Sequence, residues 1–169
     1  PSTSDRAMRV FALLNDKDQE AFWRHMVDFE NGTAFLAHGH YQAAEDCFNR
    51  VLKEFPNCYE AHANLGLCKL LRYIAGLSAD DLRALDVGHF LVAAYPTAGS
   101  VVPDRGGDSK LWYEAVKSLK KALELKEGSP LILSNLALAY LVHPDGKDVG
   151  TALEYLTKAE QAAVKADDL

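Results

Sequence analysis

Apolar residues recur along most of this chain every three or four positions, which is the spacing of one face of an α-helix. The clearest stripe consists of Phe22, Met26, Phe29, Thr33 and Leu36. Proline, glycine and cap residues separate this stripe from the next ones. The pattern predicts helices at residues 5–14, 17–38, 41–55, 59–73, 112–126, 130–142 and 151–165, with a short additional helix after Ser78.

Small and aromatic residues occupy matching places in three helix pairs. The members are Gly32, Phe35, Tyr41, Ala44, Phe48 and Val51 in the first pair, Leu65, Gly66, Trp112, Ala115, Leu119 and Ala122 in the second, and Leu133, Leu136, Ala137, Tyr140, Ala152, Leu156 and Ala159 in the third. A helix–turn–helix unit of about 34 residues with these residue types resembles the tetratricopeptide repeat (TPR). The resemblance implies an all-α fold, a short right-handed TPR-like solenoid of about three repeats, the minimum that buries a continuous core.

Two glycines lie inside predicted helices, where glycine costs about 1 kcal/mol relative to alanine. They are Gly32 and Gly66. We therefore expect a packing reason for each, namely the close approach of the paired helix. The TPR resemblance implies the same contact at both positions.

An insertion at about residues 74–110 interrupts the middle repeat and is expected to be partly irregular. Its run Val87–Tyr95 is more apolar than a solvated loop, so we expect it in the groove of the array or in the core. The stretch Pro96–Asp108 is rich in turn residues. We divide the chain into residues 1–16, an N-terminal helix and linker, and residues 17–169, the TPR-like domain with its insertion.

Composition narrows the classes of function. A length of 169 residues suits one domain or one short solenoid, and a net charge of −6 argues against a nucleic-acid surface. No apolar run approaches the roughly 18 residues that span a membrane. Cys47, Cys58 and Cys68 fit no metal template, so we expect free, part-buried thiols. Because the chain starts with Pro1 and not methionine, we expect a fragment of a longer protein, and the compartment stays undetermined.

Two short motifs associated with known chemistry are better explained as structure. The run His143–Asp145 matches the His-Pro-Asp tripeptide of J-domain proteins, but no basic helix precedes it, so we expect a turn. The stretch Asp16–Glu20 has the acid spacing of a calcium loop, but Ala21 stands where that loop requires glycine. We expect a helix N-terminus there, and no catalytic residue, metal ligand or cofactor in this chain.

The first helices of successive repeats in a TPR array line a concave groove. The candidate groove residues are Glu60, Asn64, Leu67 and Leu71 in the second repeat, and Asn135, Leu138 and Val142 in the third. Asn64 and Asn135 fall at matching places, where the resemblance implies asparagines that hold a peptide backbone. An amide can donate and accept together, which suits an extended chain. The alternative is that asparagine is merely tolerated on this face.

The basic clamp that holds the C-terminal carboxylate of chaperone tails in some TPR proteins is missing. The aligned places hold Phe29, Thr33, Leu131 and Asn135. An acidic tail of Hsp70 or Hsp90 is therefore not the expected ligand. We expect a protein or peptide partner with an apolar strip, or the chain's own insertion.

The first ten residues, Pro1–Val10, resemble a segment that follows the active-site helices in zinc metallopeptidases related to the CAAX prenyl protease. Some bacterial periplasmic members carry TPR repeats directly afterwards. The leading interpretation is a peptide-binding TPR module, and the alternative is the accessory, substrate-recruiting domain of such a peptidase, whose zinc would lie upstream. The location would then be the cell envelope or periplasm, and otherwise the cytoplasm. A third interpretation, an oligomerisation unit, predicts homo-oligomers that form as concentration rises.

Overall fold

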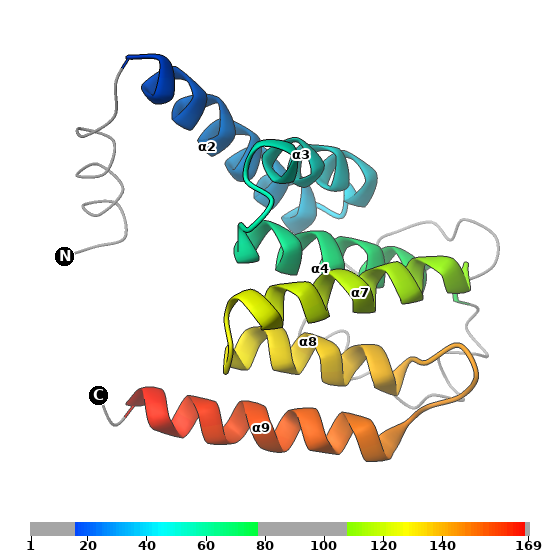
Figure 1. Ribbon diagram of the computed structural model, residues 1–169. Helices are drawn as coiled ribbons and strands as arrows, with labels where there is room; N and C mark the ends of the chain where they lie inside the picture. Colours follow the sequence, from blue (N-terminus) through cyan, green and yellow to red (C-terminus); the bar gives the residue numbers. More distant parts are fainter. Residues whose placement is uncertain (1–15, 78–107, 168–169) are drawn as a thin grey trace.

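A computed structural model describes residues 16–77 and 108–167 of the chain. This part contains six α-helices and no strand (Figure 1): α2 (Asp16–Ala37), α3 (Tyr41–Glu54), α4 (Tyr59–Ala75), α7 (Ser109–Leu125), α8 (Pro130–Leu141) and α9 (Val149–Asp167). Six of the predicted helices are confirmed. The predicted helices at 5–14 and after Ser78 lie outside the described residues, as does most of the insertion.

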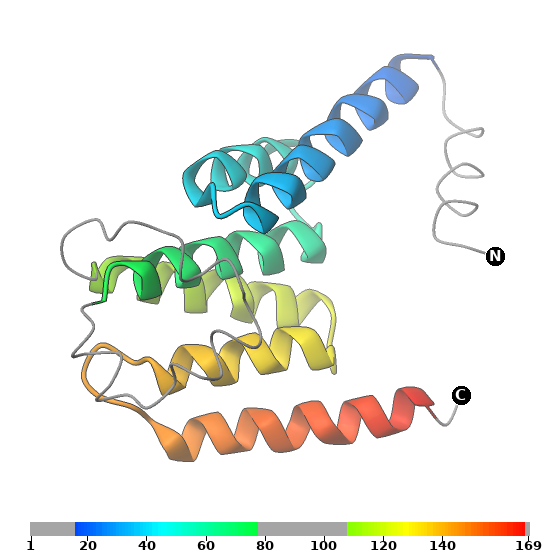
Figure 2. The same cartoon turned by 180° about the vertical axis from the view of Figure 1, so that it is seen from behind.

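The six helices form three antiparallel hairpins that stack in sequence order (Figures 1 and 2). The hairpins are α2 with α3, α4 with α7, and α8 with α9, and the stack continues through contacts of α3 with α4 and of α7 with α8. This arrangement confirms the all-α repeat fold. No helix in the described ranges combines the length and the apolar character needed to cross a membrane.

Two predicted helix starts were wrong by a few residues. Helix α7 begins at Ser109 and not at 112, because the Asp108 side chain accepts a hydrogen bond from the Lys110 amide at 2.9 Å. Helix α9 begins at Val149 and not at 151, and Asp148 accepts hydrogen bonds there from a backbone amide at 3.0 Å and a hydroxyl at 2.7 Å. Each aspartate satisfies amide groups that the first helical turn leaves unpaired.

The apolar core lies between the hairpins as well as within them. One cluster joins α3 to α4 through Phe48, Leu65 and Cys68, and a larger one joins α4, α7 and α8 around Leu119 and Leu136. A fully buried side chain of this size contributes about 1.5–3 kcal/mol relative to exposure. Repeat-to-repeat contacts therefore supply a large share of the stability, as a solenoid requires.

The two glycines inside helices sit where the paired helix comes closest, as expected. A Cβ atom at Gly32 would lie 2.9 Å from the Phe48 ring. A Cβ atom at Gly66 would lie 2.7 Å from Leu119 Cγ and 3.0 Å from the carbonyl oxygen of Ala115. The packing gain from this close approach offsets the helix-propensity cost of glycine.

Candidate functional site

The seven predicted groove residues differ in burial. On α4, Glu60 is exposed, Asn64 and Leu67 are partly buried, and Leu71 is buried. Asn135 and Leu138 on α8, and Val142 directly after it, are buried. The first half of α4 is thus accessible, whereas Leu71 and the α8 half are not open to solvent in this structure.

The structure brings the apolar groove residues together. Leu71, Leu138 and Val142 belong to one buried cluster, and Leu67 packs against its edge. Glu60 lies outside this cluster on the first turn of α4. The apolar residues predicted for the groove therefore belong to the core that joins α4 to α8, and Glu60 lies outside that core.

The positions aligned with a carboxylate clamp carry no positive charge. Thr33 is exposed and its hydroxyl donates a hydrogen bond to the Phe29 carbonyl at 2.9 Å. Leu131 is exposed, and Asn135 is buried. An acidic terminus would therefore find an apolar or neutral surface at these places, which supports the expectation of a different ligand.

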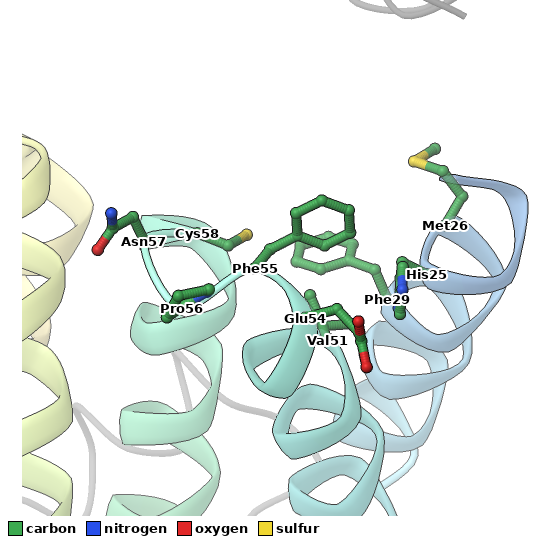
Figure 3. Close-up of a pocket in the computed structure, with 9 residues that line it drawn as sticks. All are labelled: His25, Met26, Phe29, Val51, Glu54, Phe55, Pro56, Asn57 and Cys58. Carbon is green, nitrogen blue, oxygen red and sulfur yellow. The ribbon is translucent and has the colours of Figure 1, made fainter. Parts of the chain in front are cut away.

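A second concave feature lies between α2 and α3, outside the predicted groove (Figure 3). This cleft has a volume of about 560 Å³ and is lined by His25, Met26, Phe29, Val51, Glu54, Phe55, Pro56, Asn57 and Cys58. The His25 ring meets the Phe55 ring edge-to-face with centroids 4.8 Å apart. The sequence assigned Met26 and Phe29 to an inward stripe. In the structure they lie opposite the last turn of α3 and the turn at residues 55–58, where they leave an open apolar wall.

The polar groups of this α2–α3 cleft do not form a catalytic arrangement. Burial raises the pKa of the Cys58 thiol above its ordinary value of 9.0, which suppresses the nucleophilic thiolate. The Nδ1 atom of His25 is buried, and within residues 16–77 and 108–167 it has no hydrogen-bond partner. Such a cleft suits an apolar side chain.

The cysteines are free thiols, as predicted. Cys47 and Cys68 are buried, and burial raises the pKa of Cys68 to about 12. Across the described part of the chain, no three His, Cys, Asp or Glu side chains lie close enough together to hold a metal ion.

The two motifs interpreted as structure occupy structural places. His143–Asp145 lies in the turn between α8 and α9, where the Asp145 amide donates to His143 Nδ1 at 3.1 Å. The His143 ring packs against Trp112 with centroids 4.3 Å apart. The acidic stretch that resembles a calcium loop forms the first turn of α2, which begins at Asp16. Both predictions are confirmed.

Stacked helical hairpins define the class of helical-repeat proteins. Residues 29–88 match the family model of the tetratricopeptide repeat, which supports a TPR domain in this part of the chain. No curated protein matches the chain. TPR domains are typically non-catalytic modules that bind other proteins, so the match supports a protein-interaction module in general.

Proposed function

We propose that the TPR domain binds a polypeptide segment in the concave groove between α4 and α8. The observation that carries the proposal is the equivalence of two asparagines. Asn64 and Asn135 stand 71 positions apart, the same offset that relates Leu67 to Leu138 and Leu71 to Val142. The groove thus repeats one amide and two apolar positions in two successive repeats.

The chemistry of these positions suits a chain with apolar side chains. Each amide can donate to a peptide carbonyl and accept from a peptide N–H. The apolar floor takes side chains, at about 25 cal/mol for each Å² of apolar surface removed from water. The exposed Glu60 at the outer end disfavours an acidic segment.

The polypeptide belongs to a partner or to the chain's own insertion at about residues 74–110. Burial of Leu71 at the end of α4, and of Leu138 and Val142 in the α8 half, favours the second source. A partner would reach those side chains only after other atoms had moved. A segment of the same chain also has a high effective concentration and binds with little loss of translational freedom.

A shortened chain tests this proposal. Residues 78–107 are replaced by a short glycine–serine linker, and a labelled synthetic peptide of residues 87–95 is titrated against it by fluorescence anisotropy. Saturable binding to the shortened chain, with weaker binding to the intact chain, is expected. Circular dichroism verifies that the shortened chain is helical. A helical shortened chain that does not bind the peptide rules out the insertion as the groove ligand.

Substitutions then test the groove residues. Asn64→Ala should weaken peptide binding about fivefold, since one hydrogen bond contributes about 1 kcal/mol. Adding Asn135→Ala should extend the loss by a similar factor. Asn49→Ala, an exposed asparagine on α3, is the matched control and should have no effect. Equal affinity in all variants removes the asparagines from the mechanism.

A second proposal concerns the parent protein, and it rests on the resemblance of residues 1–10 to the zinc metallopeptidase segment. In that case the domain recruits substrates for a bacterial enzyme of the cell envelope, and the zinc belongs to the upstream domain. The upstream gene decides the matter. A His-Glu-x-x-His motif before Pro1 supports the proposal, and its absence ends it.

A further inference from the structure

The second helix of each repeat presents the same residue positions toward the next repeat. Phe48 on α3, Leu119 on α7 and Leu156 on α9 occupy one place in the template. Phe48 and Leu119 are 0% exposed, whereas Leu156 is 40% exposed. The difference arises because α4 covers α3 and α8 covers α7, while α9 is the last helix of the stack (Figure 2).

Two neighbouring positions on α9 show the same change. Val149 is 44% exposed, and its counterparts Tyr41 and Trp112 are 4% and 3% exposed. Leu153 is 57% exposed, and its counterparts are Val116, which is 7% exposed, and Glu45, a buried carboxylate that pairs with Arg72 of α4. The outer repeats of a solenoid ordinarily carry a polar outer face. Helix α9 instead carries apolar residues at three positions that the internal interfaces bury, and we call Val149, Leu153 and Leu156 the tail face.

The two internal interfaces show which kind of surface fits the tail face. The covering residues lie on a first helix at spacings of four and three, namely Ala61, Leu65 and Cys68 on α4, and Ile132, Leu136 and Ala139 on α8. Both sets are buried. A first helix that presents small or apolar residues at this spacing therefore continues the interface.

Among the described helices, α2 is a further first helix with that register, and it lies at the opposite end of the stack (Figure 1). The residues 34 positions before the α4 set are Val27, Asn31 and Ala34, which we call the head face. All three are exposed, and Val27 is 52% exposed. Each molecule thus has an open tail face and an open head face in matching register.

We propose that the tail face of one copy packs against the head face of a second copy, so that the superhelix of repeats continues from molecule to molecule. A second copy is the expected partner because its α2 would cover α9 in the same way that α4 covers α3 and α8 covers α7. Asn31 stands where the internal interfaces have leucine, so the contact is weaker than theirs and forms at high protein concentration. A heterologous contact of this kind extends openly unless it closes into a ring.

Light scattering coupled to size-exclusion chromatography on the intact chain tests the proposal, over about 10 µM to about 1 mM for a weak contact. The expected result is a mass that rises with concentration. The double variant Leu153→Glu with Leu156→Glu, and separately Val27→Glu, should each lower the association constant at least about tenfold. Leu131→Glu changes an exposed leucine on α8 outside both faces and should have no effect.

Mixing the two blocked variants separates this contact from any other mode of association. The tail variant keeps its head face and the head variant keeps its tail face, so an equimolar mixture should form dimers and stop there. A chain that stays monomeric at the highest concentration overturns the proposal. So does a Val27→Glu variant that still assembles through the tail face, because that result indicates pairing of α9 with α9. Circular dichroism of each variant checks that it is folded, and folded variants are expected because the replaced side chains are exposed.

Discussion

Replacing Gly66 with alanine tests whether close helix packing, and not helix propensity, determines this position. Alanine favours the helix by about 1 kcal/mol over glycine. The added methyl group, however, would stand 2.7 Å from Leu119 Cγ and 3.0 Å from the Ala115 carbonyl oxygen. One neighbour is backbone and the other is fully buried, so neither can move at low cost.

The two effects have opposite signs, and their sizes decide the result. Overpacking a core typically costs about 1–3 kcal/mol, and the backbone contact at Gly66 places this case in the upper part of that range. Subtracting the propensity gain leaves a net destabilisation of about 1–2 kcal/mol. In the Leu119→Ala background the closest contact is gone and only the 3.0 Å contact with the Ala115 carbonyl remains, so the net cost of Gly66→Ala should fall close to zero there.

Urea unfolding followed by circular dichroism measures the four free energies of this cycle. Gly150→Ala in α9 is the matched control, because a Cβ atom there meets only Asp148 Oδ1, at 3.6 Å. That variant should be unchanged or more stable by up to about 1 kcal/mol. The reasoning is refuted if Gly66→Ala is as stable as the parent chain, or if its effect is the same with and without the Leu119 side chain.

Three further outcomes are expected. Arg72→Ala should cost about 1–3 kcal/mol in urea unfolding, because it removes the 3.0 Å partner of the buried Glu45 carboxylate, whereas replacing both residues with apolar ones should be near neutral. A thiol reagent at neutral pH should modify Cys58 slowly and Cys68 only on unfolding, since burial raises the pKa of both thiols. Equal modification rates for Cys58 and Cys68 in the folded chain would contradict this expectation. Hydrogen bonds lower the pKa of Asp148 below its ordinary value of 3.8. The ionised carboxylate therefore stabilises the fold fully above pH 3.8, and this stabilisation is lost as the pH falls through the lower pKa of the folded state. The melting temperature of Asp148→Asn should depend less on pH in that acid range than the melting temperature of the parent chain.

Much of the fold follows from local patterns in the sequence. The stripes at spacings of three and four identify the helices, and Gly32 and Gly66 indicate where paired helices touch. The apolar stripe alone places the starts of α7 and α9 two or three residues too late, because each helix begins directly after its capping residue and not at its first buried one. Asp108 and Asp148 precede those helices directly, and their hydrogen bonds decide where each helix begins.

The candidate site was harder to predict from the sequence than the fold was. Periodicity assigns a residue to a helix face but does not say what covers that face. Asn64 and Asn135 are equivalent by register, yet one is partly exposed and the other buried. The α2–α3 cleft forms where the end of α3 and the turn at residues 55–58 meet α2. The helical stripe alone does not show that these residues leave an open space between them.

The burial pattern of the third repeat links the two proposals. Helix α8 is apolar on nearly every side, and a helix of that kind is stable only with neighbours on every side. Helices α7 and α9 supply two of them and α4 supplies a third, and the proposed groove ligand would lie beside α4 and α8. Helix α9 shows the complementary case, because Ala152 and Ala159 are buried against the stack while Leu153 and Leu156 remain open. On the two proposals, a groove ligand covers one side of the third repeat and the first helix of a second copy covers the other.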